Sequence, residues 1–392
     1  MPESPAEYAL TATKNVAPLA HLTRFVQLAV GIGCVAGLLA CASEKPQPAP
    51  LGPSPTLLPV RSAWTSQLGA VGFALQPSVA GNTVLLAAND GTVAALDARN
   101  GSALWRASVG NALSAGVGSD GKLAAVVTRS NELVSLDAGR ELWRQKLSAQ
   151  VFTAPLVAGA RVFVLSADRS ISAFDGQSGS KLWSVQRPGE PLVLRQAGVL
   201  TAVGDTLVVG VAGRLLGINP ANGSIRWEAP IATPRGTNDI ERLVDLTGPV
   251  SRLGDVLCVR AFQSAVGCVN ATRGTVLWTR PANGAEGLQG DDSKLYGSEA
   301  DGKLLAWKRA NGERAWASEQ LLRRGVSAPA VQGAAVVVGD DAGLVHWFAR
   351  EDGTPLARMA TDASGLAFGP VVVGNTLVVV TRAGTVYGFV PQ

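Results

Sequence analysis

Short apolar segments recur along most of the chain, each bounded by turn-forming residues. They read TVLLAA at 83–88, KLAAVV at 122–127, RVFVLS at 161–166, TLVVGV at 206–211, VLCVRA at 256–261, KLYGSE at 294–299 and AVVVGD at 335–340, and TLVVVTRAGTVYGFV closes the chain at 376–390. Apolar runs of this length between turn signals are typical of buried strands. Asp-Gly and Asn-Gly pairs between them supply the positive φ angles that tight hairpins require. Each unit therefore predicts four short antiparallel strands.

A Gly-x-x-x-Trp element follows the apolar segment in most units. It occurs at Gly101/Trp105, Gly139/Trp143, Gly179/Trp183, Gly223/Trp227, Gly274/Trp278 and Gly312/Trp316, and a degenerate copy has Gly353 followed by Ala357 and Arg358. A repeat of four strands every 40 residues or so is typical of a propeller blade. Because the tryptophan keeps a fixed place in the repeat, we expect it to pack between blades and not to bind a ligand.

The two ends of the ring complement each other. The C-terminal copy lacks a tryptophan strand, whereas residues 61–69, RSAWTSQLG, carry Trp64 without a hairpin of their own. Joining them gives an eighth unit and leaves no open sheet edge between the chain ends. The predicted fold is all-β: an eight-bladed β-propeller of four-stranded antiparallel blades over residues 61–392, closed by the N- and C-terminal strands.

The segment before the repeats predicts export and lipid attachment. Residues 25–40 form an apolar run that follows Arg24, and Leu38-Leu39-Ala40-Cys41 resembles the lipobox of bacterial lipoproteins. The run is short for a membrane-spanning helix, which takes about 17–25 residues, so we expect residues 1–40 to be a cleaved signal peptide and Cys41 to be lipidated. Residues 41–60 contain six prolines, which predicts an extended tether reaching about 50–60 Å.

Charge and composition exclude several function classes. The net charge is +4 without a basic run, so nucleic acid is a poor candidate for a partner. The two histidines are His21, inside the predicted signal, and His346, inside an apolar strand. We find no clustered metal ligands, no hydrolytic triad and no phosphate-binding glycine motif. The sequence therefore predicts a protein that is not an enzyme and needs no cofactor or metal.

Two cysteines remain in the ring once Cys34 leaves with the signal and Cys41 takes lipid. Cys258 and Cys268 flank the second hairpin of the fifth unit. They face each other across paired strands if 262–264 form the turn. Two interpretations are open: a disulfide that clips one blade, or a pair of buried free thiols. The oxidising conditions of export favour the disulfide.

The repeat Asp97-Ala98 to Trp105, the lipobox at Cys41 and the eight closed copies resemble the PQQ-like repeat propellers, and among them the BamB lipoproteins of outer-membrane β-barrel assembly. Two further segments resemble the loops by which that family binds BamA, the central barrel-inserting subunit. The first holds Leu192, Val193, Leu194 and Arg195, and the second, 238–246, holds Arg242, Leu243 and Asp245. The family often has an acidic residue shortly after the second segment, where this chain has Thr247.

The resemblance implies a scaffold lipoprotein anchored in the outer membrane and facing the periplasm. Its partners would be BamA, the rest of the barrel assembly complex, and unfolded outer-membrane proteins. Two alternatives stay open. One is a PQQ-dependent quinoprotein dehydrogenase, although the adjacent cysteines that such enzymes place beside the cofactor do not occur here. The other is a propeller that binds another envelope partner, such as a polysaccharide, for which Trp307 and Trp347 are the tryptophans outside the repeat.

Overall fold

The computed structural model describes residues 47–72, 76–189 and 192–392. The predicted signal peptide, 1–40, and the predicted lipid attachment site, Cys41, lie outside these residues. Every regular element within the described ranges is a β-strand. No helix in this part of the chain is long and apolar enough to cross a membrane.

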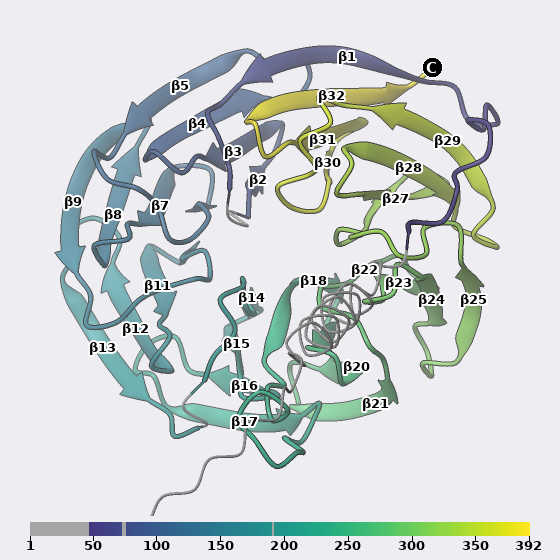
Figure 1. Ribbon diagram of the computed structural model, residues 1–392. Coiled ribbons are helices and arrows are strands. Elements are labelled where there is room, and N and C mark those ends of the chain that lie inside the picture. Colours follow the sequence, from purple (N-terminus) through teal and green to yellow (C-terminus); the bar gives the residue numbers. More distant parts are fainter. Residues whose placement is uncertain (1–46, 73–75, 190–191) are drawn as a thin grey trace, which may run out of the picture. The chain divides into compact units, whose positions relative to one another are not determined.

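Eight four-stranded antiparallel sheets form the ring that the repeat predicts (Figure 1). Blade 1 contains β2 (Ser78–Ala80), β3 (Thr83–Ala87), β4 (Thr92–Asp97) and β5 (Ala103–Ser108). Blade 2 contains β6 (Gly118–Ser119), β7 (Leu123–Val127), β8 (Glu132–Asp137) and β9 (Arg140–Lys146). Blade 3 contains β10 (Leu156–Ala158), β11 (Arg161–Leu165), β12 (Ser170–Asp175) and β13 (Lys181–Gln186). Blade 4 contains β14 (Leu200–Val203), β15 (Thr206–Val211), β16 (Arg214–Ile218) and β17 (Ile225–Pro230).

The remaining blades repeat this order from the axis outward. Blade 5 contains β18 (Leu246–Leu253), β19 (Val256–Ala261), β20 (Ala265–Asn270) and β21 (Thr275–Pro281). Blade 6 contains β22 (Gln289–Gly290), β23 (Lys294–Ser298), β24 (Leu304–Lys308) and β25 (Arg314–Ser318). Blade 7 contains β26 (Ala330–Gln332), β27 (Ala335–Gly339), β28 (Leu344–Ala349) and β29 (Pro355–Ala360). Blade 8 contains β30 (Val371–Val373), β31 (Thr376–Val380), β32 (Thr385–Pro391) and β1 (Val60–Gln67).

The predicted closure of the ring is confirmed. Strand β1, from the N-terminal side, pairs antiparallel with the C-terminal strand β32 and forms the outer edge of blade 8 (Figure 1). Trp64 lies opposite Gly388 in this pair. Since the first and last strands of the propeller share one sheet, the ring cannot open without breaking a strand pair.

Each repeated tryptophan packs on a glycine of the following blade. Trp143, on the outer strand of blade 2, lies against Gly179 at the tight turn of blade 3, where an added Cβ would come within 2.6 Å of the indole. The seven pairs of this kind are Trp64/Gly101, Trp105/Gly139, Trp143/Gly179, Trp183/Gly223, Trp227/Gly274, Trp278/Gly312 and Trp316/Gly353. Trp143 also donates its indole N–H to the carbonyl of Gly176, at 2.9 Å. Trp143 thus joins neighbouring blades by both apolar packing and a directed hydrogen bond.

The strand pairing in blade 7 explains why its Gly-x-x-x-Trp element is degenerate. In the other blades the outer-strand tryptophan faces a small residue on the third strand, such as Ala173 opposite Trp183. In blade 7 the pair is reversed, with Trp347 on the third strand opposite Ala357 on the fourth. The following blade has no glycine turn to receive an outer tryptophan, because the two ends of the ring meet there, and Gln392 donates its N–H to the Pro59 carbonyl.

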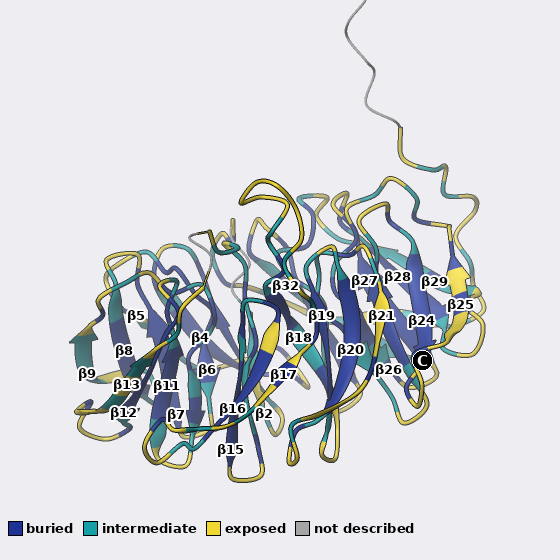
Figure 2. Ribbon diagram, turned by 90° about the horizontal axis from the view of Figure 1, so that it is seen from below, coloured by how far each residue is buried: buried dark blue, intermediate teal, exposed yellow. Residues whose placement is uncertain are grey.

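The antiparallel order of the strands gives the ring two different faces. The connections from one blade to the next leave at the same end as the turns between second and third strands, and we call this end the connection face. The turns that hold the repeated glycines lie at the other end, the turn face. The middle strands are buried, and the loops at both faces carry most of the exposed residues (Figure 2).

Part of the predicted tether, 41–60, lies against the ring. Residues 48–58 are packed on its outside beside β29. Leu57 and Leu58 donate their N–H groups to the Leu356 carbonyl, and Thr56 forms a β-bridge with Ala357. Prolines keep a segment extended but do not prevent it from pairing where its other residues retain N–H groups, since an edge strand offers unpaired backbone groups.

Cys258 and Cys268 lie directly opposite each other on β19 and β20. A disulfide joins them in the structure, and both side chains are buried. The bond clips the two middle strands of blade 5 together.

Packing on the repeated glycines can be tested in blade 3. Gly179 and Gly159 both have positive φ, but a Cβ at Gly159 meets no atom within 4 Å. Gly159→Ala should lower the free energy of unfolding by about 1 kcal/mol, the conformational cost alone. Gly179→Ala should lower it by about 1–3 kcal/mol more, because the methyl group overlaps the Trp143 ring. Urea unfolding of both variants measures the difference, and equal losses would contradict the packing role.

The disulfide can be tested chemically. Protein exported from its native host and alkylated under denaturing, non-reducing conditions should show neither Cys258 nor Cys268 alkylated by mass spectrometry. The bond spans a sequence separation of 10 residues, so Cys258→Ala with Cys268→Ala should lower the free energy of unfolding by about 2–3 kcal/mol. Alkylation of both thiols would show that the pair is reduced.

Candidate functional site

The two predicted binding segments lie on the connection face. Residues 192–195 belong to the connection between β13 and β14, and residues 242–245 belong to the connection between β17 and β18. Both connections therefore leave blades 3 and 4 at the same end of the ring. The interval that holds the second segment is also the longest, 51 residues from Trp227 to Trp278. Its extra length forms a loop beyond the blades and not an additional strand.

A hydrogen bond joins the two segments. Asp245, just before β18, accepts the backbone N–H of Leu194 at 2.9 Å. The two residues are 51 positions apart in the chain. A carboxylate that accepts a backbone N–H forms one of the stronger hydrogen bonds in proteins, so Asp245 holds the first segment against the second.

Exposed apolar and cationic side chains lie on the two segments that this hydrogen bond joins. Leu192 is 42% exposed and Ile240 is 74% exposed. The guanidinium of Arg195 lies over the ring of Phe152 at 5.9 Å from its centroid, and Arg169 donates to the Leu192 carbonyl at 3.1 Å. We call the surface formed by Leu192, Arg195, Ile240 and Arg242 the connection patch.

The remaining predicted residues support the patch from below. Val193, Leu194, Leu243 and Asp245 are partly buried. Three of them, Val193, Leu194 and Asp245, line a small open pocket of about 60 Å³ together with Phe152. Of the predicted set, Leu192 and Arg195 are exposed, whereas Arg242 is partly buried. The predicted binding residues therefore include both surface side chains and partly buried side chains that position them.

Ile240 is a surface residue that we did not single out from the sequence. It sits in a polar turn, in which Asn238 accepts the N–H of Glu241 at 2.9 Å and Glu241 accepts the N–H of Thr237 at 2.8 Å. Backbone hydrogen bonding from Thr237 lowers the pKa of the Glu241 carboxyl, so the turn is braced by an ionised side chain. The sequence did contain a signal for its exposure, since Ile240 is the one apolar residue among the polar residues of 237–242.

Thr247 does not belong to the exposed surface. It is 1% exposed and lies on β18, where it pairs with Arg260 on β19 and bridges Gly198. An acidic side chain at this position would be buried inside blade 5. The difference from the family pattern at Thr247 therefore does not remove a side chain from the connection patch.

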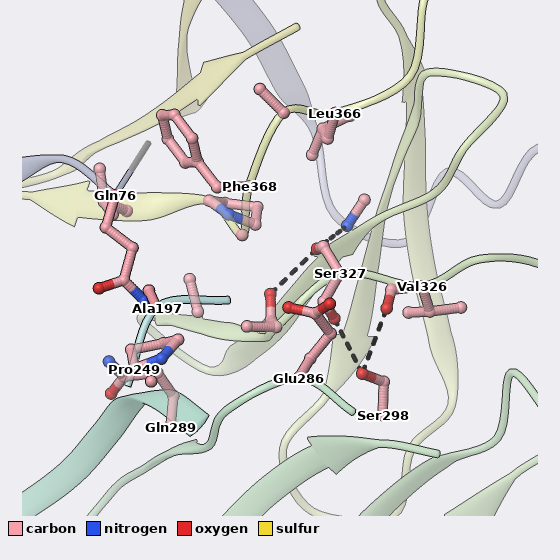
Figure 3. Close-up of a pocket in the computed structure, with 18 of the residues that line it drawn as sticks. Gln76, Ala197, Pro249, Glu286, Gln289, Ser298, Val326, Ser327, Leu366 and Phe368 are labelled. Atoms are coloured by element: carbon pink, nitrogen blue, oxygen red, sulfur yellow. Dashed lines mark hydrogen bonds between the residues drawn. The ribbon is translucent and has the colours of Figure 1, made fainter. Parts of the chain in front are cut away.

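The axis of the propeller contains a channel of about 1140 Å³ that opens beside the patch. Gln76, Glu286, Gln289 and Phe368 are among its lining residues (Figure 3). Burial raises the pKa of the Glu286 carboxyl, although the positive charge of Arg260 opposes that rise. Arg195 lines the mouth of this channel as well as the patch, so the two features share one face.

In the part of the chain that the structure describes, the side chains that the alternative functions would use are engaged elsewhere or lie apart. Among the described residues, no group of three or more His, Cys, Asp or Glu side chains is placed to hold a metal ion. The two cysteines of the ring are bonded to each other in blade 5, and they are not neighbours in sequence. His346 is buried with its Nε2 3.1 Å from the Asp340 carboxylate.

Sugar recognition through the additional tryptophans also finds no support. Trp307 and Trp347 are 4% and 0% exposed. Trp347 donates its indole N–H to Gln332 at 2.9 Å inside blade 7. Both rings are therefore part of the core and present no stacking surface.

Comparison with known proteins gives consistent matches. The family model described as outer membrane protein assembly factor BamB matches residues 63–318. The outer membrane protein assembly factor BamB of Burkholderia pseudomallei is 36% identical over 93% of this chain and 98% of its own length. That of Bordetella pertussis is 34% identical over 90% of this chain and 92% of its own length.

A solved structure supports the same fold. The crystal structure of BamB from Moraxella catarrhalis superposes with a TM-score of 0.77, at 23% identity, and the match covers 84% of this chain and 99% of that one. These relatives are named as assembly factors and not as dehydrogenases. The chain belongs to the BamB family of outer membrane protein assembly factors.

Proposed function

We propose that this protein is a non-catalytic scaffold in the assembly of outer membrane proteins, and that the connection patch binds BamA. The names of its relatives support the general role. The observation that carries the site is the hydrogen bond from Leu194 to Asp245, which makes one surface out of two distant segments.

The composition of the patch suits a protein partner. Exposed Leu192 and Ile240 provide apolar area, while Arg195 adds a cation held over an aromatic ring. Arginine beside apolar anchors is a frequent source of binding energy at protein interfaces. Asp245 and the braced turn at 238–241 already hold the loops in place. Little conformational entropy should therefore be lost when the partner binds.

The remainder of the proposed function concerns location. Cys41 carries the lipid anchor after removal of residues 1–40, and the ring faces the periplasm from the inner leaflet of the outer membrane. The apolar run at 25–40 and the lipobox at 38–41 support this proposal. Several acyl chains on one residue anchor firmly, since each buried CH₂ contributes about 0.8 kcal/mol. Unfolded outer-membrane proteins are a further proposed partner of the scaffold.

Charge reversal on the patch tests the binding site. Arg195→Glu with Arg242→Glu should reduce recovery of BamA at least tenfold in a pull-down from envelope extract with the full-length protein. Ile240→Asp should also reduce recovery, because it places a charge among apolar contacts. Arg140→Glu with Arg273→Glu is the matched control, since both exposed arginines lie at turns on the opposite face. Unchanged recovery with the patch variants, while all variants retain the wild-type unfolding midpoint, would refute the assignment.

Lipid attachment is tested separately. Cys41→Ala should leave the signal uncleaved by the lipoprotein route and abolish incorporation of radiolabelled palmitate, since the thiol that carries the lipid is gone. Wild-type protein should take up label and sediment with outer membranes. Label incorporation at the wild-type level in Cys41→Ala would place the anchor elsewhere.

A further inference from the structure

Residues 48–58, which we call the strap, bind along the outside of the ring at blades 6 and 7. The strap begins at the connection face, where Ala49 donates its N–H to the Leu322 carbonyl at 2.9 Å and accepts from Arg324 at 3.1 Å. Leu322 and Arg324 belong to the connection from β25 to β26. The first described residues are therefore fixed at the same face as the connection patch.

The middle of the strap is held by Arg358, on the outer strand β29. Arg358 donates to the carbonyls of Gly52 at 2.7 Å and Leu51 at 3.5 Å. Ser54 returns a hydrogen bond to the Arg358 carbonyl at 3.3 Å. Arg358 stands next to Ala357, the position at which blade 7 has lost its tryptophan.

The end of the strap pairs with β29 as a short additional strand. Thr56 bridges Ala357, and the N–H groups of Leu57 and Leu58 reach the Leu356 carbonyl at 3.0 and 3.1 Å. Leu58 packs in the same apolar cluster as Ala357 and Trp347, whereas Leu57 is 70% exposed. Leu51 packs against a second cluster, which contains Trp316.

The prolines of the strap make this binding less costly. Its four prolines, Pro48, Pro50, Pro53 and Pro55, restrict the unbound segment, so less conformational entropy is lost when it docks. Because proline has no backbone N–H, these positions leave no donor unpaired when the strap docks. The strap thus combines backbone pairing, two partly buried leucines and a pre-extended chain.

We infer that the strap sets the distance and the orientation of the ring at the membrane. This inference rests on the lipid anchor at Cys41 in the proposed function. With the strap docked, seven residues separate Cys41 from Pro48, which sets an upper limit of about 25 Å on their distance at 3.3–3.6 Å per residue. An undocked chain as far as Val60 would reach about 50–60 Å. The docked strap holds the rim of the connection face near the lipid surface and turns the connection patch and the channel mouth toward the membrane side.

The first test measures docking without reference to the membrane. In full-length protein, hydrogen exchange of peptides covering 48–58 should be at least tenfold slower than in the Leu51→Asp, Leu58→Asp variant, because that variant places two charges in apolar clusters. Leu57→Asp, on the same segment but exposed, should exchange like the wild type. Exchange of the wild-type strap at the rate of an unstructured peptide would overturn the inference.

The second test measures orientation at a bilayer. Ala334 and Ala342 are both exposed and flank β27, so they lie at opposite faces of one blade, about 20 Å apart. A fluorophore on Ala342→Cys should transfer energy to headgroup-labelled lipid at least twofold more efficiently than one on Ala334→Cys. The protein is the full-length lipoprotein in nanodiscs of phosphatidylethanolamine and phosphatidylglycerol. Twelve Gly and Ser residues inserted after Gln47, or the Leu51→Asp, Leu58→Asp variant, should remove most of the difference.

The outcomes distinguish the strap from the anchor. Equal transfer from the two positions in membrane-bound wild-type protein, or stronger transfer from position 334, overturns the orientation while leaving lipidation intact. Protein that does not associate with the nanodiscs at all refutes the lipid anchor itself, and with it the set distance. Slow exchange in the strap then still shows docking, which the first experiment measures independently.

Discussion

The contact of each outer tryptophan with a glycine of the next blade is the interaction on which the ring depends. It requires a large aromatic ring at one position and the absence of a side chain at another, in the neighbouring blade. The glycine also adopts a positive φ, as at Gly179 with φ of 72°, so its turn and its packing role need the same residue. Repetition of this contact around the ring fixes the relative placement of successive blades.

A ring fixed in this way leaves its connecting loops free to differ. Packing between blades constrains the side chains of the strands. The connections on one face only have to span from an outer strand to the next inner strand, so their sequence and length can vary. The patch lies on two such connections, and its geometry depends on Asp245 reaching across to Leu194. The rigid scaffold brings the two segments near each other, and the hydrogen bond then joins them.

Blade 7 connects ring closure with the N-terminal segment. The outer tryptophan has no receiving glycine where the ends of the ring meet, and Trp347 supplies the aromatic volume from the third strand instead. The outer strand that carries Ala357 is then covered by residues 48–58. The exception in the repeat therefore coincides with the place where the chain enters the propeller.

The sequence by itself determined the class of the fold, the number of blades and the closing strand that carries Trp64, because the period of the repeat and the placement of glycine and tryptophan are local patterns. It also identified the segments at 192–195 and 242–245 through their resemblance to a family. The tertiary structure decided which of those residues are exposed, placed Ile240 on the surface and Thr247 in the core, and docked half of the predicted tether on blade 7. These features depend on pairing between residues far apart in the chain, such as Thr56 with Ala357 and Leu194 with Asp245, and no local pattern of hydrophobicity or turn residues encodes which distant backbone groups will meet.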